Sequence, residues 1–274
     1  MRLDAYLVKK HPEFSRSVLQ KFIKAGRVIV DGKVVLEPKH NVSSKNVVTS
    51  NFELPTSNFV DLPIIYEDEN VIVINKPAGV LTHSKGALNE EFTVSDFILS
   101  RSPSNHITIQ PSNRHGIVHR LDRGTSGVII GAKNEETLKF LQKQFGNRKV
   151  KKTYLALVGK TPKQDEFIID LPIARNPKKP STFRVDAKGK SAITNVKVIE
   201  KFDDGSALLE LRPLTGRTHQ LRVHLAHIGS PIVGDIVYGK PADRMYLHAK
   251  SLETTLPGGE RKNFTADTPK EFDK

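Results

Sequence analysis

The chain contains no cysteine, so disulfide bonds, thiolate nucleophiles and cysteine-ligated zinc sites are all excluded. No apolar run approaches the roughly 20 residues that a membrane-spanning helix needs. The first residues, Met-Arg-Leu-Asp, also lack the apolar core of a secretory signal peptide. We therefore expect a soluble, cytoplasmic protein without a membrane partner.

Acidic residues are scarce relative to basic ones. The chain has 30 aspartates and glutamates against 43 lysines and arginines, which gives a formal net charge of +13. A surplus of this size favours a polyanionic partner, and nucleic acid is the first candidate. The 274 residues, 37% of them hydrophobic, suffice for one good core and a second, smaller domain.

The first fifty residues are densely basic, with ten lysines and arginines against four acidic residues. The serines around Arg16 and the glycine at position 26 predict a helix that runs to about residue 25. Its apolar residues fall on one arc, whereas Arg16, Lys21 and Lys24 fall on the opposite arc. We expect the apolar arc to pack and the basic arc to bind RNA phosphates.

A hairpin is predicted after this helix. The apolar residues 28–30 and 33–35 flank an Asp-Gly pair, which favours a type I′ turn. With its Ser-Arg-Ser and Gly-Arg-Val-Ile-Val-Asp-Gly-Lys sequences, the segment resembles a small RNA-binding module first known from a small-subunit ribosomal protein. The resemblance implies an RNA-binding domain over residues 1–50. Residues 51–61 have the composition of a linker, which leaves residues 62–274 for a second domain.

Residues 119–127 have the sequence His-Arg-Leu-Asp-Arg-Gly-Thr-Ser-Gly and run into an apolar segment. This pattern predicts a tight loop that leads into a buried strand. Arg120 and Arg123 flank Asp122, and we expect these opposite charges to keep the carboxylate ionised. Asp122 is then suited to act as a nucleophile or an electrostatic stabiliser. From the charge pattern alone, a surface cluster without a catalytic role stays the alternative.

Several further elements are predicted around this motif. We expect a hairpin from residues 64–66 and 71–74, helices over 93–102 and from a cap at Asn134, and loops over 102–114 and 172–190. The last segment, 253–274, is expected to form a final strand or two and a frayed tail. The second loop is basic and is expected to contact RNA. Lys76 ends a strand, and we expect it to be exposed, either in reach of RNA phosphate or without a specific role.

Two segments complete the candidate site. Residues 152–158 alternate as a strand and place Tyr154 inside a sheet. Farther along the chain, Thr218 is suited to cap a helix that begins near His219. On this helix Arg222 and His219 are expected on a polar side, opposite an apolar side.

The motifs of the second domain resemble those of the RluA-type RNA pseudouridine synthases. They are Asn-Lys-Pro-Ala-Gly-Val within 66–80, His-Arg-Leu-Asp with Thr-Ser-Gly at 119–130, Lys-x-Tyr-x-Ala-x-Val at 152–158, and Gly-Arg-Thr-His-Gln-Leu-Arg with a following Gly-Asp within 215–235. All four agree in order along the chain. The family implies an α+β fold, in which a mixed, largely antiparallel sheet with flanking helices surrounds a cleft. In this chain a small α+β RNA-binding domain would precede it.

The resemblance also implies an activity and the residues for it. The family isomerises uridine to pseudouridine in RNA without a cofactor or metal. Asp122 is then the essential carboxylate, Arg222 the arginine paired with it, and Tyr154 the ring against the target uracil. Arg120 would displace the uridine from its stack. The residues to which we assign RNA binding are Arg120, Arg16, Lys21, Lys24 and Arg217.

Other functions stay open at this point. The same basic surfaces would serve a non-catalytic RNA-binding or ribosome-assembly factor. His219, His224 and His227, together with His119 and Asp122, would suit a metal-dependent nuclease, but the three helical histidines share no single face, so we expect no metal site. By family analogy, large-subunit ribosomal RNA is the first candidate substrate and transfer RNA the alternative. We expect a monomer.

Overall fold

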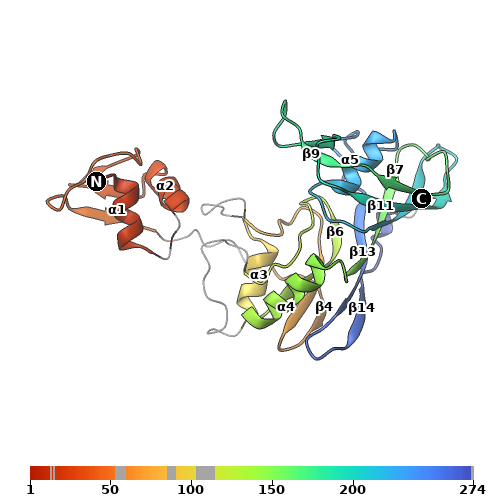
Figure 1. The fold of residues 1–274 in the computed structure, drawn as a ribbon, viewed down its shortest axis with the longest axis horizontal. Coiled ribbons are helices and arrows are strands. Elements are labelled where there is room, and N and C mark those ends of the chain that lie inside the picture. Colours follow the sequence, from red (N-terminus) through yellow and green to blue (C-terminus); the bar gives the residue numbers. More distant parts are fainter. Residues whose placement is uncertain (13, 15, 53–59, 85–90, 103–114, 273–274) are drawn as a thin grey trace.

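A computed structural model describes residues 1–12, 14, 16–52, 60–84, 91–102 and 115–272 (Figure 1). The described residues form separate hydrophobic cores before residue 53 and after residue 61. The predicted loop at 102–114, except its first residue, and most of the predicted linker at 51–61 lie outside the described residues. None of the described helices is long and apolar enough to cross a membrane.

The N-terminal unit packs two helices against a three-stranded sheet of order β2-β1-β3. Its elements are α1 (Leu3–Lys10), α2 (Arg16–Lys24), β1 (Val28–Val30), β2 (Lys33–Val34) and β3 (Val48–Ser50). Asp31 and Gly32 have φ angles of 50° and 77°, and the type I′ turn requires both to be positive. The predicted helix and hairpin are therefore confirmed.

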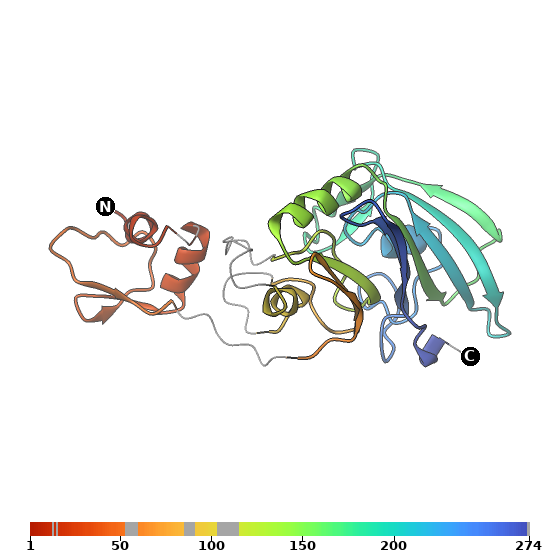
Figure 2. The same cartoon turned by 90° about the horizontal axis from the view of Figure 1, so that it is seen from below.

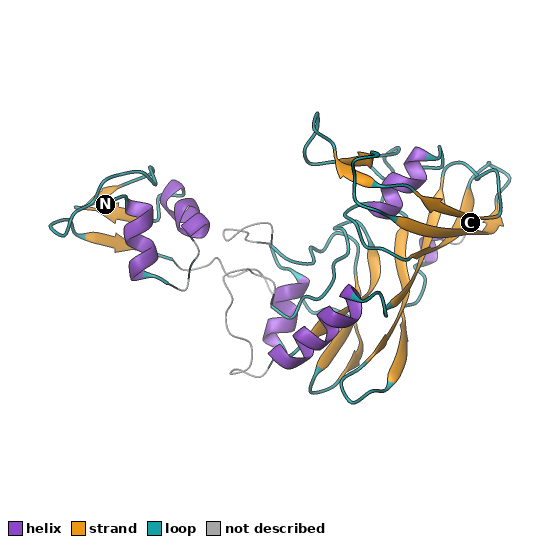
Figure 3. Ribbon diagram, viewed as in Figure 1, coloured by secondary structure: helices purple, strands orange, loops and turns teal. Residues whose placement is uncertain are grey.

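The second unit is built on one nine-stranded sheet (Figures 2 and 3). Its strands are β4 (Ile64–Glu67), β5 (Val71–Lys76), β6 (Ser126–Ala132), β7 (Lys151–Val158), β8 (Glu166–Asp170), β11 (Ile193–Lys201), β12 (Ala207–Pro213), β13 (Leu247–Thr255) and β14 (Arg261–Thr265). Their order is β4-β5-β6-β13-β7-β12-β11-β8, and β14 also pairs with β13. Among these described strands, β6 and β13 run parallel and every other neighbouring pair is antiparallel. The predicted mixed, largely antiparallel sheet is confirmed.

Two helices cover opposite faces of the sheet at β5 and β6. Both strands are buried at nearly every position, so both faces of the sheet need cover. One face packs on α3 (Val94–Ser100) and the other on α4 (Glu135–Gly146). Thr93 and Asn134 cap these helices with their side chains, as the capping preferences of these residue types predict.

The helix α5 (Gln220–His227) packs on the other half of the sheet, where its leucines join the core formed by β7 and β12. Thr218 does not cap it. His219 occupies that position in a left-handed conformation, with φ of 57° and without a side-chain cap. All six residues from Gln220 to Leu225 are buried. The predicted division is nevertheless confirmed: His219 and Arg222 lie on the side that faces Asp122, whereas Leu221 and Leu225 join the hydrophobic core.

Residues 172–190 do not form the predicted loop throughout. They contain a two-stranded hairpin of β9 (Ile173–Arg175) and β10 (Phe183–Val185). Strands of three residues are too short for alternation to reveal them in the sequence. The hairpin packs beside α5, where Phe183 and Val185 share a small core with Val223.

The C-terminal segment is ordered up to residue 272. After β14, a short 3₁₀ helix (Lys270–Phe272) buries Phe272, which is 2% exposed. The ring lies against Tyr246 and His248. The predicted frayed tail is therefore wrong up to this residue, because the aromatic contacts hold it.

Candidate active site

Arg222 lies between two carboxylates, those of Asp122 and Asp235. Its Nε and Nη2 atoms donate to Asp235 Oδ2 and Oδ1 at 2.8 Å each, and its Nη1 donates to Asp122 Oδ2 at 3.0 Å. Burial by itself would lower the pKa of Arg222, but the two carboxylates raise it. The charged, planar guanidinium thus binds both acids at once, which the single ammonium of a lysine could not do with this geometry.

Asp235 is fixed by the turn in which it lies. Its Oδ1 also accepts from the backbone N–H groups of Val237 and Tyr238, at 2.9 and 3.1 Å. Burial would raise the pKa of Asp235, but the hydrogen bonds and the charge of Arg222 lower it overall. The preceding Gly234 has φ of 76°, and a Cβ there would lie 1.6 Å from Arg244 O, so the turn requires glycine. Sequence reasoning assigned no role to Asp235, although its Gly-Asp pair belongs to the motif at 215–235.

The arginines that flank Asp122 in the sequence do not hold its carboxylate. Arg123 forms an ion pair with Glu91 instead. Arg120 is exposed. The carboxylate is bound by Arg222, 100 residues farther along the chain. The expectation from local charge is therefore wrong, and the pairing implied by the family resemblance is present.

Lys76 supports the loop that carries Asp122. Its Nζ donates to the carbonyl oxygens of Pro77, Val80 and Arg123 at 2.9, 2.8 and 3.2 Å. The side chain is fully buried, and burial lowers its pKa to about 7 although the charge of Asp122 opposes this shift. The prediction of an exposed lysine is wrong, because Lys76 binds backbone rather than phosphate.

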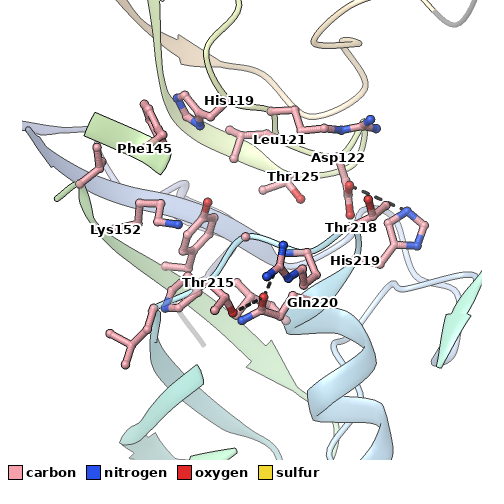
Figure 4. Close-up of a pocket in the computed structure, with 18 of the residues that line it drawn as sticks. His119, Leu121, Asp122, Thr125, Phe145, Lys152, Thr215, Thr218, His219 and Gln220 are labelled. Atoms are coloured by element: carbon pink, nitrogen blue, oxygen red, sulfur yellow. Dashed lines mark hydrogen bonds and ion pairs between the residues drawn. The ribbon is translucent and has the colours of Figure 1, made fainter. Parts of the chain in front are cut away.

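The carboxylate and the guanidinium border a cavity of about 560 Å³ (Figure 4). The other predicted residues of this domain, Tyr154, Arg120 and Arg217, line the same cavity. The structure thus brings together all five residues predicted for the second domain. Burial and the charge of Asp122 raise the pKa of Tyr154, so its phenol is neutral near pH 7.

Another wall of the cavity is formed by His119, Phe145 and Lys152 (Figure 4). The rings of His119 and Phe145 stack, with centroids 4.7 Å apart and planes 18° apart. Burial, and then the charge of Lys152, lower the pKa of His119 to about 3, so the imidazole is neutral. Its Nε2 accepts from Ile130 N at 3.1 Å. This wall offers a flat surface and one basic side chain. Sequence reasoning gave Phe145 no role in the site, whereas Lys152 begins the motif at 152–158.

The histidines near α5 have separate surroundings. His219 Nδ1 contacts the hydroxyl of Tyr238 at 2.8 Å. Both ring nitrogens of His224 are occupied, by Thr194 Oγ1 at 3.0 Å and Leu171 O at 2.9 Å. Within the described ranges, no three His, Cys, Asp or Glu side chains are placed to hold a metal ion. These histidines serve as hydrogen-bonding groups of the fold and the site.

The basic residues predicted on α2 divide into two kinds. Lys21 and Lys24 are exposed. Arg16 instead binds Asp4 through Nε at 3.2 Å and Nη2 at 3.0 Å. Asp4 is fully buried, and it also accepts from Arg2 and from Gln20. Arg16 therefore joins α2 to α1, whereas the two lysines face solvent.

Known proteins share both units of this chain. Residues 70–227 match the model of the RNA pseudouridylate synthase family, and residues 1–48 match that of the S4 domain. The curated ribosomal large subunit pseudouridine synthase D of Xylella fastidiosa is 40% identical over 97% of this chain and 80% of its own length. The protein of the same name from Escherichia coli is 38% identical over 93% and 83%.

A solved structure agrees with this likeness. Human RNA pseudouridylate synthase domain containing 1 superimposes with a TM-score of 0.63 at 28% identity, over 78% of this chain and 86% of its own. The predicted pseudouridine-synthase fold is thereby confirmed. Since the family model spans more than half of the residues, the chain belongs to the RNA pseudouridylate synthase family, whose members convert uridine to pseudouridine in RNA.

Proposed function

We propose that the protein isomerises chosen uridines of large-subunit ribosomal RNA, with Asp122 as the essential carboxylate. The observation that carries this proposal is the Asp122–Arg222 pair at the border of a cavity that Tyr154 also lines. The names of the relatives from Xylella and Escherichia support this class of RNA. The net charge of +13 and the S4 domain support binding to a large, structured RNA.

The reaction breaks the bond between ribose C1′ and N1 of the base and forms a bond from C1′ to C5. The proton on C5 leaves, and N1 gains one, so the product is an isomer of the substrate. Asp122 acts at the sugar or the base, where Arg222 aims the carboxylate. Because Asp235 binds Nε and Nη2 of Arg222, the orientation of the guanidinium does not depend on the RNA.

Tyr154 holds the base while it turns. A flipped-out base needs flat surfaces on which to stack, and a neutral phenol supplies one without competing for protons. Arg120, exposed at the edge of the cavity, takes the place that the uridine vacates in the RNA. Arg217 contributes a second guanidinium, which Ser191 O already orients through Nε at 3.0 Å.

We further propose that the enzyme works as a monomer in the cytoplasm. The five proposed residues of the site come from one chain and line one cavity, so this arrangement needs no second copy. Lys21 and Lys24 of the N-terminal unit add phosphate contacts away from the site.

The proposal is tested by mapping pseudouridines at single-nucleotide resolution. Unmodified ribosomal and transfer RNA, and partly assembled large subunits, are incubated with the wild-type protein or with Asp122→Ala. We expect new marks in large-subunit RNA from the wild type and none from the variant. RNA binding by Asp122→Asn should stay within roughly threefold, because the substitution removes one charge and little volume.

Three outcomes would contradict the proposal. Marks confined to transfer RNA would overturn the substrate class and leave the role of Asp122 intact. Equal marks from wild type and variant would remove Asp122 from the mechanism. Absence of marks on all three substrates, with tight binding retained, would favour a role in ribosome assembly.

A further inference from the structure

His219 lies directly before α5, and its imidazole faces the free oxygen of Asp122. Arg222 binds Asp122 Oδ2, whereas His219 Nε2 lies 3.9 Å from Asp122 Oδ1 (Figure 4). The backbone of His219 is left-handed, with φ of 57°, a conformation uncommon for residues other than glycine. The chain thus adopts an unfavoured conformation at the residue that faces the carboxylate.

The tautomer of this imidazole follows from its hydrogen bonds. Phe183 N donates to the hydroxyl oxygen of Tyr238 at 2.8 Å. His219 Nδ1 lies 2.8 Å from the same oxygen. The backbone N–H already approaches this oxygen as a donor, so the phenolic hydrogen is free to be donated to Nδ1. A neutral imidazole that accepts at Nδ1 carries its hydrogen on Nε2, which faces Asp122.

Burial of the ring favours its neutral form. Burial lowers the pKa of His219, and the charges of Arg222 and Arg120 act in the same direction. Asp122 and Asp235 oppose the shift without reversing it. The rings of Phe183 and Tyr238 pack edge-on against the imidazole, with centroids 5.5 and 5.6 Å away, and fix its plane.

We propose that His219 is a positioning residue for the isomerisation, whose Nε2–H binds Asp122 Oδ1 when RNA fills the cavity. This inference rests on the proposed role of Asp122. At 3.9 Å the two atoms are too far apart for a hydrogen bond, and such contacts often shorten when substrate binds. Arg222 and His219 would then hold one carboxylate oxygen each, so that the carboxylate cannot rotate.

Tyr238 determines the tautomer of His219, and the backbone of β10 in turn orients the hydroxyl of Tyr238. The hydroxyl of Tyr238 fixes the tautomer, and its acceptor lone pair is engaged by the backbone of Phe183 in the hairpin. The hairpin, its turn and the segment that follows β10 also carry basic side chains: Arg175, Lys178, Lys179, Arg184, Lys188 and Lys190. The hydrogen bonds thus run from the hairpin through Tyr238 to His219, which faces Asp122.

The proposal is tested with Tyr238→Phe, His219→Ala and His219→Gln, and with Tyr66→Phe as the matched control. The hydroxyl of Tyr66 binds Asp68, away from the cavity. We expect single-turnover rates to fall by at least about tenfold in Tyr238→Phe and further in His219→Ala, with RNA affinity within about twofold of wild type. His219→Gln keeps an N–H donor near the position of Nε2 and should recover part of the loss. Tyr66→Phe should react at the wild-type rate.

A second measurement does not depend on turnover. The ¹⁵N spectrum of histidine-labelled protein distinguishes protonated from unprotonated ring nitrogens, and His219→Gln identifies the signals of His219. We expect a hydrogen on Nε2 in the wild type and a loss of this preference in Tyr238→Phe. The opposite tautomer in the wild type would overturn the proposal, whatever the RNA substrate.

Kinetics would overturn it in another way. If folded His219→Ala and Tyr238→Phe react at the wild-type rate, His219 does not position the carboxylate. If the wild type itself marks no RNA, the proposed function fails instead, and the spectrum still reports whether His219 presents an N–H to Asp122.

Discussion

Asp235 binds Arg222 through two parallel hydrogen bonds of 2.8 Å, on the side of the guanidinium away from the cavity. Asp235 is 1% exposed, and contacts within the protein fix its position in the absence of RNA. The remaining nitrogen, Nη1, is left for Asp122. The direction in which Arg222 points is therefore built into the free protein, which is the usual arrangement for a group that must be preorganised.

We expect Asp235→Asn to lower activity although residue 235 does not contact the substrate. The amide removes the negative charge and presents a donor to a donor, so Arg222 loses one of its two bonds and turns. We expect the single-turnover rate to fall at least about tenfold and the free energy of unfolding to fall by roughly 3 kcal/mol, as when one partner of a buried ion pair is removed. Tritium release from C5 of labelled uridine and urea unfolding measure the two effects. The exposed Asp203→Asn is the control, and equal rates for both variants would contradict the role of Asp235.

Lys76→Met should reduce stability and leave the ionic part of RNA binding unchanged. Three partly buried carbonyl oxygens lose their donor, at a cost of roughly 3 kcal/mol. Because Nζ does not reach solvent, the slope of log Kd against log salt should equal that of wild type. The exposed Lys270→Met should affect neither quantity. If the salt slope is shallower for Lys76→Met but not for Lys270→Met, Lys76 contacts RNA phosphate, as the sequence suggested.

His119 should make the stability of the second unit dependent on pH. Its pKa is about 3 in the folded state and near 6.5 when unfolded. Between these values the unfolded state binds a proton that the folded state does not, so stability is highest above pH 6.5 and falls as the pH drops. Each pH unit in this window costs about 1.4 kcal/mol.

His119→Gln removes this dependence and keeps an acceptor for the backbone N–H of Ile130. Between pH 6.5 and pH 5, the wild type should lose about 2 kcal/mol more stability than the variant. Urea unfolding at the two pH values, followed by a probe in the second unit, gives the difference. His248, whose pKa burial also lowers, to about 4, contributes equally to both proteins. Parallel pH profiles would show that His119 is charged in the folded state.

The N-terminal helix α2 allows binding and stability to be separated. Lys21→Gln with Lys24→Gln removes two exposed cations, and the salt slope of RNA binding should fall by about one to two. The melting temperature should not change. Arg16→Gln should instead lower the melting temperature of this unit, because the buried carboxylate of Asp4 loses a partner. If Arg16→Gln changes the salt slope as the lysines do, its guanidinium also contacts phosphate.

Local signals in the sequence were sufficient for several elements. Asn134 is the predicted helix cap, Asp31-Gly32 is the predicted type I′ turn, and each of these preferences acts within a few residues. The start of α5 depends in addition on a distant strand. Gln220 binds its near neighbours Thr215 and Arg217 N, and its amide also donates to Ile193 O, 27 residues earlier in the chain. No capping preference records such contacts.

The candidate site shows the same division. The charge pattern alone predicted that Arg120 and Arg123 hold the carboxylate of Asp122, whereas in the structure Arg222, 100 residues away, binds it. Only the family motif predicted that pair. Asp235 was not found, because a carboxylate that acts through an arginine has no chemistry of its own to recognise in a sequence. Lys76 was misplaced because a buried lysine is rare without an acidic partner, and here backbone carbonyls replace one.

The position of β13 determines when the enzyme becomes complete during synthesis. Ala249 of this strand pairs with Gly127 on one side and with Tyr154 on the other, so it sets the spacing between the Asp122 loop and the tyrosine. A nascent chain whose β13 has not yet emerged from the ribosome lacks this connection. The N-terminal unit draws its core from residues made long before and is expected to fold first. We therefore expect ribosome-bound chains to bind RNA before they can modify it.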